Sequence, residues 1–206
     1  SDDFPPILER ESETRDLLSI LVQKFKNNAI LVGEAGTGKT AIVEGLAQAL
    51  AIGNVPDAIK GFSLWELDLP KLSNKDESDG GYRFRIQNIV QEVVEAGNII
   101  LFVDETHSIL DKKSDLDVGG LLKPSLARGE LRMIGSTTDI EFHTYIEQDK
   151  ALVRRFQRVT VQELGRDSVV RILKSRKRSL EVFHGVTVSS GAIEAAVDLG
   201  LRYLPS

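Results

Sequence analysis

The sequence predicts an α/β fold: a parallel sheet covered by helices, followed by the start of a small C-terminal helical unit. Through the first 163 residues, short apolar runs typical of strands alternate with segments whose apolar residues recur at helical spacing. Such alternation is the pattern of a parallel sheet with right-handed crossovers. Beyond residue 164, two helix-like segments follow each other. We therefore expect a large α/β subdomain at residues 1–163 and a partial, truncated helical subdomain at residues 164–206.

Each expected element has its own signal. Strands are expected where a short run is continuously apolar or alternates, and a continuous run is typical of a strand buried on both faces. The expected strands are residues 29–32, 61–69, 97–105, 130–138 and 156–164. Helices are expected where apolar residues form one stripe at helical spacing. The expected helices cover residues 17–25, 39–50, 86–94, 167–183 and 190–204.

The composition is that of a globular protein and excludes several classes. The chain has 206 residues, of which 41% are hydrophobic, and a net charge of -5, which disfavours a general polyanion binder. It has no cysteine, and therefore neither a disulfide framework nor a thiolate metal site, which fits a reducing, cytoplasmic setting. No apolar run approaches the roughly 20 residues that span a bilayer, so no membrane partner is expected.

A phosphate-binding motif lies between an expected strand and an expected helix. The segment GEAGTGKT, Gly33 to Thr40, fits the pattern G-x-x-x-x-G-K-[ST]. Gly36 and Gly38 let the backbone curl until its N–H groups converge on phosphate oxygens, and the following helix adds the positive end of its dipole. Lys39 is expected to reach the outer phosphates, and the Thr40 hydroxyl to hold Mg²⁺. A glycine-rich turn without a ligand is disfavoured by the flanking elements.

A second motif, IILFVDE, ends the expected strand at 97–105. Asp104 is expected to hold Mg²⁺ through water, and Glu105 to orient and deprotonate an attacking water. In the next strand, IGSTT places Thr138, with Thr137 as the weaker candidate, where a hydroxyl could meet the γ-phosphate. That signal is weak alone because threonine is common in strands.

Two groups of basic residues can be explained as solvated surface charges. Arg154 and Arg155, in ALVRRF, follow a short helical segment, where solvated cations are favoured by the helix dipole. On the pattern alone, that solvated reading is the favoured one. The run KSRKR at 174–178 lies on an expected amphipathic helix of an acidic chain, which indicates a solvated face rather than a nucleic-acid contact. The three histidines are scattered without metal-ligand spacing.

Taken together, these motifs in this order resemble the AAA+ superfamily, specifically the first ATPase module of Clp-type unfoldases (the ClpB/ClpC/ClpE/ClpL group). The resemblance spans nearly the whole chain. The matching text is KNNAILVGEAGTGKTAIVEGLAQALAIGNVP, EAGNIILFVDETHSIL, GGLLKPSLARGELRMIGSTT, YIEQDKALVRRF and FHGVTV. The resemblance implies the P-loop AAA+ fold with a helical lid, ATP or ADP and Mg²⁺ as ligands, and a homo-oligomeric ring, typically a hexamer.

The resemblance also implies a role for individual residues. Asp104 and Glu105 match the Walker B pair, and Thr138 matches the sensor-1 position. Arg154 and Arg155 match paired arginine fingers that reach a neighbouring subunit's nucleotide, which reverses the solvated reading. The implied nucleotide-binding residues are Ile7 and Leu8 on adenine, Gly36, Thr37, Gly38, Lys39, Thr40 and Ala41 on the phosphates, Asp104, and Ile172 in the lid.

The sequence departs from the family pattern at two places that matter here. The usual VIGR near the start is PILER, with Glu9 in place of glycine. The substrate-gripping loop, typically KYRG in the family, aligns with ESDG, which puts Ser78 at the tyrosine position. Either the loop grips weakly, or it is re-registered and Tyr82 takes the tyrosine role.

Three functions are therefore open. The leading one is ATP hydrolysis that drives a ring-forming chaperone to remodel unfolded or aggregated proteins, with a protease as a further partner that the resemblance allows. The second is a nucleotide-gated ring-assembly module with little gripping of its own. The third, an AAA+ DNA-loading factor, is disfavoured by the net acidity and by LLKPSLARGEL.

Overall fold

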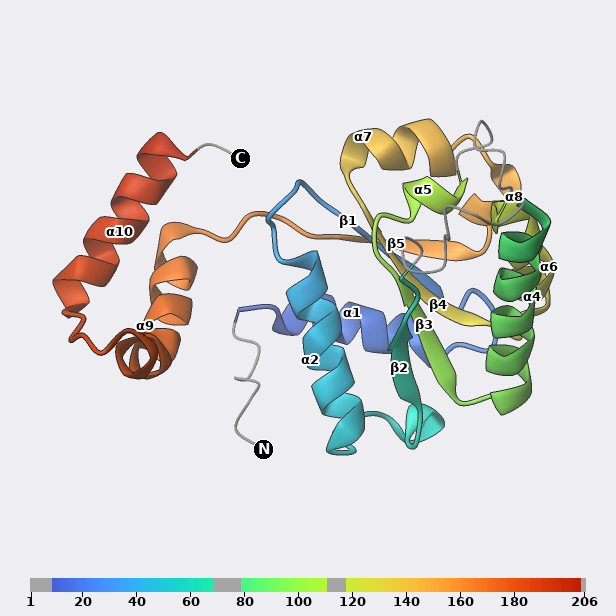
Figure 1. Cartoon of the computed structure of the whole chain (residues 1–206), viewed down its shortest axis with the longest axis horizontal. Coiled ribbons are helices and arrows are strands. Elements are labelled where there is room, and N and C mark those ends of the chain that lie inside the picture. The colour runs from blue at the N-terminus through green and yellow to red at the C-terminus, as the bar shows by residue number, and fades with distance from the viewer. Residues whose placement is uncertain (1–8, 69–78, 111–117, 205–206) are drawn as a thin grey trace.

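The computed structural model describes residues 9–68, 79–110 and 118–204. In this part of the chain, five parallel strands form one sheet in the order β2-β3-β4-β1-β5, with helices on both faces. Two further helices, α9 and α10, follow the last strand and lie beside the sheet (Figure 1). The strands are β1 (Asn28–Val32), β2 (Ser63–Glu66), β3 (Ile99–Val103), β4 (Arg132–Thr137) and β5 (Phe156–Thr160). The predicted fold class is confirmed.

The helices differ greatly in length. The longer ones are α1 (Glu11–Leu21), α2 (Lys39–Ala51), α4 (Asp79–Ala96), α6 (Val118–Arg128), α9 (Arg166–His184) and α10 (Ser190–Tyr203). The short ones are α5 (His107–Leu110), α7 (Asp139–Glu141), α8 (Lys150–Val153), the 3-10 turn η1 (Asp57–Ile59) and the π-helical turn η2 (Phe142–Ile146). The helix expected at 17–25 ends at Leu21, and Phe25 lies beyond it, exposed.

Alternating side chains of the central strands build two apolar layers. In β1, Ala29 and Leu31 pack with α1 and α2, whereas Ile30 and Val32 pack with α4 and α6 on the other face. The same alternation holds in β3 and β4. A side-chain period of two with both faces covered is the signature of a sheet buried between helices. The fold therefore has three layers, with the sheet between two layers of helices. Because both faces of the sheet are covered, a site is expected at the ends of the strands.

The strand register places the carboxyl ends of three strands at one edge. Val32 of β1 pairs with Thr137 of β4, and Val103 of β3 pairs with Gly135. Strand β4 therefore lies between β1 and β3, and the segments after all three begin close to one another. In parallel sheets this edge is where ligands bind.

Helices α9 and α10 form a separate pair at the end of the described chain (Figure 1). Arg166 binds the carboxylate of Asp198 through Nε and Nη2, at 2.5 and 3.0 Å, and Lys174 lies 3.1 Å from Glu194. Several apolar side chains of this pair are exposed, among them Val182, Phe183 and Tyr203. No helix in the described residues is long and apolar enough to cross a membrane.

Candidate functional site

The Walker A loop, residues 33–40, has three positions at which the structure favours glycine. Gly36 and Gly38 adopt φ of 78° and 90°, in the left-handed region. Gly33 is required for a different reason, because a Cβ there would overlap the carbonyl oxygen of Val161, which follows β5. Gly38 is also the N-cap of α2, so the loop delivers its N–H groups directly to a helix N-terminus. This arrangement is suited to bind an anion.

Lys39 and Thr40 begin α2 beside this loop. The Lys39 ammonium donates to the carbonyl oxygens of Gly33 and Glu34, at 2.7 and 2.8 Å. Charged phosphate oxygens are stronger acceptors for an ammonium than neutral carbonyls, so Lys39 can exchange these partners for a phosphate. Thr40 is exposed in the first turn of α2, and Ala41 beside it is half-buried. Both stand where the sequence predicts phosphate contacts.

Arg10, to which the sequence assigned no role, contacts the Walker A loop through a hydrogen bond to its backbone. Its guanidinium is buried and donates to the carbonyl oxygen of Thr37 and, at 2.6 Å, to Glu13 in α1. Burial raises the pKa of Glu13, but hydrogen bonds from Ser12, from the backbone and from Arg10 outweigh it and lower this pKa below its usual 4.5. Glu13 is therefore charged, and the buried pair fixes the Walker A loop to α1.

Asp104 and Glu105 follow β3 at the same edge of the sheet, and both are exposed. Ser136 of β4 donates its hydroxyl to Oδ1 of Asp104, and the backbone N–H of Glu105 donates to the same Oδ1 at 3.0 Å. Glu105 has φ of 48°, an uncommon conformation for a residue with a side chain. These contacts fix the Asp104 carboxylate. Ser136 was missed because the sequence reasoning considered only the threonines after it.

Close packing behind these acids fixes their turn. Thr106 is fully buried, and its hydroxyl donates to the Val103 carbonyl at 2.9 Å and accepts from the Ser136 N–H at 3.0 Å. A Cβ at Gly135 would overlap this hydroxyl. The backbone of β4 therefore approaches the turn after β3 as closely as it does only because residue 135 is glycine.

Thr138 caps the short helix α7 after β4. Its Oγ1 accepts from the Glu141 N–H at 3.3 Å, while the Glu141 carboxylate accepts from the Thr138 N–H at 2.9 Å and from the Thr137 hydroxyl at 3.0 Å. Burial raises the pKa of Glu141, and these hydrogen bonds, with the charge of His107, lower it below its usual value. A hydroxyl that accepts one hydrogen bond still has a proton to donate. The sensor role of Thr138 stays a prediction.

Arg154 and Arg155 lie at the opposite end of the strands, where β1 and β5 begin. They stand between α8 and the first residue of β5, Phe156, which pairs with Asn28 at the beginning of β1. The Walker A loop begins after the other end of β1, about 13 Å away at the usual rise per residue. Arg154 is exposed and Arg155 half-buried, and within the described ranges neither guanidinium has a carboxylate partner. The structure does not bring this pair to the other predicted residues of the same chain.

A cleft of about 350 Å³ lies between the Walker A loop and the lid helices. It is lined by Arg10, Ala35, Gly36, Thr37, Glu163, Leu164, Val169 and Leu204. Ile172 lies in α9 about one turn beyond Val169 and is half-buried, but it is not one of the residues that line the cleft. Ile7 and Leu8 lie outside the described residues. The adenine contacts of these three residues stay predictions.

Tyr82 does not have the placement that a gripping role requires. It lies in the first turns of α4 and is 8% exposed, packed in the core beside Ile86 and Val90. The helical spacing of 82, 86 and 90 places it on the apolar stripe of α4. Its ring is a core side chain, which counts against the suggestion that a re-registered loop offers Tyr82 to substrate; that suggestion stays a prediction. Ser78 lies outside the described residues.

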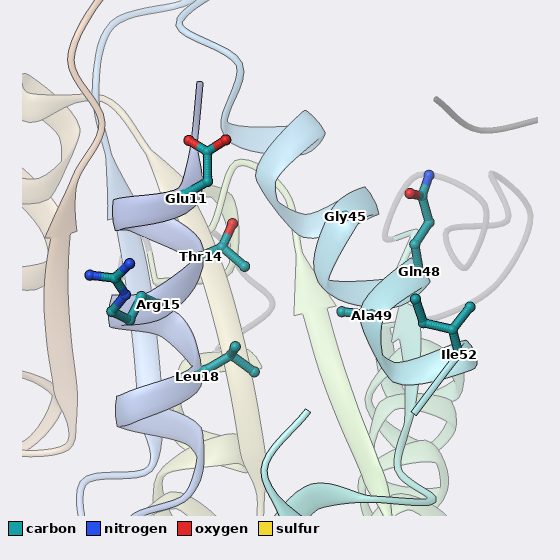
Figure 2. A pocket seen from close by; sticks show the side chains of 8 residues that line it. All are labelled: Glu11, Thr14, Arg15, Leu18, Gly45, Gln48, Ala49 and Ile52. Atoms are coloured by element: carbon teal, nitrogen blue, oxygen red, sulfur yellow. The ribbon is translucent and has the colours of Figure 1, made fainter. Parts of the chain in front are cut away.

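A second hollow, of about 380 Å³, lies between α1 and α2 and contains none of the predicted site residues (Figure 2). Leu18 and Arg15 come from α1, and Ala49 and Ile52 from α2. It is open to solvent, and it presents methyl and methylene groups more than polar ones. We regard it as the seam between two packed helices.

The chemistry of the acids at the carboxyl edge fits Mg²⁺ better than a transition metal. Within the described part of the chain, no group of three or more His, Cys, Asp or Glu side chains could enclose an ion. Mg²⁺ prefers oxygen ligands, keeps several waters, and is usually held by one or two carboxylates together with substrate phosphates. Asp104 and the Thr40 hydroxyl are donors of this kind.

The family profiles that match this sequence cover most of it. The profile described as "ATPase family associated with various cellular activities (AAA)" matches residues 29–164, and the profile described as "AAA lid domain" matches residues 165–206. The division expected at residues 163 and 164 stays a prediction.

Similar proteins agree with these profiles. The chain is 43% identical over 202 residues to the chaperone protein ClpB of Aquifex aeolicus (strain VF5), covering 97% of this chain and 20% of that protein. It is 44% identical over 203 residues to ClpB of Lactococcus lactis subsp. cremoris (strain MG1363), covering 23% of it. A solved S. cerevisiae Hsp104-ADP complex superposes with a TM-score of 0.91 at 37% identity, over 99% of this chain and 35% of that one. The chain thus spans about a fifth to a third of the proteins that it matches.

Proposed function

We propose, from the premise that this chain belongs to the AAA ATPase family, that it binds ATP with Mg²⁺ and hydrolyses it as one module of a ring-forming Clp-type chaperone. The predicted class of enzyme, an ATPase, is confirmed at the level of the family. Mg²⁺ dependence, the ring and the remodelling of unfolded protein are the parts that we add.

The observation that carries the proposal is a division of the chemistry between two edges of the sheet. The Walker A loop, Asp104 and Glu105 share the carboxyl edge, whereas Arg154 and Arg155 stand at the amino end of β5. An arginine at that end lies at the far end of the strands from the phosphate loop of its own chain. A neighbouring chain whose carboxyl edge met this surface would receive both guanidinium groups. The nucleotide site is then completed between two copies.

The residues at the carboxyl edge divide the reaction between them. Lys39 leaves the loop carbonyls to hold the outer phosphates, and the Walker A N–H groups hold the remaining oxygens. Glu105 accepts a proton from the water that attacks the γ-phosphorus, while Ser136 keeps the Asp104 carboxylate in place. Asp104 and the Thr40 hydroxyl would hold Mg²⁺, which would supply positive charge against the phosphates when bound. Arginines of the neighbour stabilise the charge that develops as the γ-phosphoryl group leaves ADP.

The concentration dependence of the rate tests this proposal. If sites are completed between copies, ATP hydrolysis per mole of protein rises with protein concentration, since arginine fingers contribute about 10³–10⁵ in rate. Arg154→Ala or Arg155→Ala mixed with unchanged protein suppresses the rate more than dilution does. Arg15→Ala, an exposed arginine of α1, is the matched control. A rate strictly proportional to concentration, unaffected by mixing, contradicts the shared site.

A second function is favoured by the position of Tyr82: a module that binds ATP to assemble a ring and does not itself pull on substrate. With Tyr82 in the core and ESDG at the gripping position, the expected aromatic contact is lacking in the described residues and in the aligned sequence. Glu105→Gln in the full-length protein separates the two functions, because it retains ATP binding and stops hydrolysis. Loss of substrate unfolding with the ring intact favours remodelling, and retained unfolding favours assembly.

Partners follow from the same reasoning. One solved relative is an S. cerevisiae Hsp104:casein complex, which superposes with a TM-score of 0.88 at 38% identity. By analogy we propose unfolded or aggregated protein as the substrate of the full-length protein, in the cytoplasm and in a ring of six. A partner protease and the absence of nucleic-acid binding stay predictions.

A further inference from the structure

Glu9 is the residue at which this sequence departs from the glycine usual in the family, and the structure gives it a contact. Its carboxylate accepts two hydrogen bonds from the Arg171 guanidinium, one from Nε and one from Nη2 at 2.8 Å, and a third from the Ser168 hydroxyl at 2.7 Å. Both partners lie in the lid helix α9, about 160 residues away in sequence. A carboxylate that accepts a bidentate arginine is fixed in direction as well as in distance.

The backbone at Glu9 has a conformation that glycine would adopt more easily. Its φ is 70°, in the left-handed region. A side chain there is unfavourable and persists where its surroundings compensate. The hydrogen bonds from Arg171 and Ser168 supply that compensation. The same hydrogen bonds, that from Arg171 first, lower the pKa of Glu9 from 4.5 to about 2. Glu9 is therefore charged over the whole physiological range.

The next residue, Arg10, has its own contact on the opposite side of the cleft. Its guanidinium holds the Thr37 carbonyl of the Walker A loop and Glu13 of α1. Two consecutive residues thus reach in different directions, Glu9 to the lid and Arg10 to the phosphate loop. Arg10 and Thr37 line the cleft from the loop side, and Val169, between the two lid partners of Glu9, lines it from the lid side.

We propose that Glu9 is a positioning residue that latches the lid helix α9 to the segment preceding α1, and so sets the width of the cleft beside the Walker A loop. The latch holds the lid where it covers a bound nucleotide, and its opening accompanies release. This effect on nucleotide rests on the proposed function. The latch itself does not, because its contacts lie within the chain alone.

A distance measurement between the two parts tests the latch without nucleotide. The chain has no cysteine, so Gln91→Cys in α4 and Ser179→Cys in α9, both exposed, give two unique positions for spin labels. In otherwise unchanged protein we expect one narrow distance distribution. Glu9→Gly, which suits the backbone, and Arg171→Ala should each broaden it, and the two changes together should broaden it no further than either alone. Raised salt should broaden it only where the pair is present.

Arg178→Ala, an exposed arginine two turns along α9, is the matched control and should leave the distribution unchanged. Equal distributions in the unchanged protein and in both single variants would overturn the proposal, as would broadening in the Arg178→Ala control. Circular dichroism checks that each variant is folded, which Glu9→Gly should be because glycine relieves the strained φ.

Release of a fluorescent ADP analogue supplies the second readout. We expect about two- to fivefold faster dissociation in Glu9→Gly, the change that loss of a partly exposed ion pair produces. Absence of any nucleotide binding, with the distance result as expected, would refute the proposed function and leave the latch standing. Unchanged release despite a broadened distribution would refute the link between latch and nucleotide.

Discussion

Removing the buried guanidinium of Arg10 should destabilise the fold and the Walker A loop together. Arg10→Ala leaves the Thr37 carbonyl without its side-chain donor and the Glu13 carboxylate without its counter-charge. The two side chains of this pair are only 5% and 13% exposed. Breaking a buried ion pair by deleting one partner costs about 3–5 kcal/mol. Glu13 keeps a hydrogen bond from Ser12 at 2.6 Å, so we expect a cost below that range, about 2–3 kcal/mol.

That loss is large enough to measure by thermal unfolding. For a chain of this length, 1 kcal/mol shifts the midpoint by about 2–4 °C, so Arg10→Ala should lower it by about 4–12 °C. Calorimetry with and without ADP measures both the fold and the loop, because a loosened Walker A loop also reduces the stabilisation by nucleotide. Arg10→Lys keeps the charge but cannot bridge two acceptors as a planar fork, and should be intermediate.

The control for this substitution is Arg15→Ala in the same helix. Arg15 is exposed, and surface changes of this kind usually stay within about 0.5 kcal/mol. If Arg10→Ala lowered the midpoint no more than Arg15→Ala, the buried pair would not be what fixes the loop, and the reasoning would be refuted.

Three further substitutions test other contacts. Gly135→Ala forces a Cβ against the buried threonine hydroxyl behind the Walker B turn, and should cost about 1–3 kcal/mol in urea unfolding; an unchanged midpoint would show that the turn can move. Ser136→Ala removes the hydroxyl that donates to Asp104. It should raise the Mg²⁺ concentration needed for half-maximal ATPase activity about two- to tenfold at nearly normal stability, and an unchanged Mg²⁺ requirement would count against the role of Ser136. Tyr82→Ala should destabilise by about 3 kcal/mol, while Phe84→Ala, exposed, should be nearly neutral; similar midpoints for the two would mean that Tyr82 is not a core residue.

The parts of the site that lie on contiguous sequence were predictable, and the parts assembled across the fold were not. Lys39 and Asp104 stand in short motifs whose spacing is fixed by one strand and one turn, so the sequence alone is enough to predict them. Arg10 acts on a loop 27 residues away, and Ser136 on an acid 32 residues away, through a buried side chain and a strand register. Nothing in the local pattern reports either contact.

The fold was predicted better than the ends of its elements. Periods of two and of 3.6 residues locate strands and helices, but several apolar residues are ambiguous at helix ends. Phe25 continues the helical spacing of α1 yet lies beyond its end, because the helix already ends at Leu21. Tyr82 was predicted to lie in a loop because the residues before it are acidic and rich in glycine, which does not indicate a helix, although α4 already begins at Asp79. Both errors concern where a helix begins or ends.

The separation of the two edges of the sheet has a consequence for symmetry. A contact between the carboxyl edge of one copy and the arginine-bearing edge of the next joins two different surfaces, and is therefore heterologous. Such contacts have a polarity and repeat from head to tail, so they close only if the rotation between copies divides a full turn. One variant copy without Arg154 would disable a site that belongs to its neighbour and leave its own intact. A defect in this module would therefore act on the copy next to it.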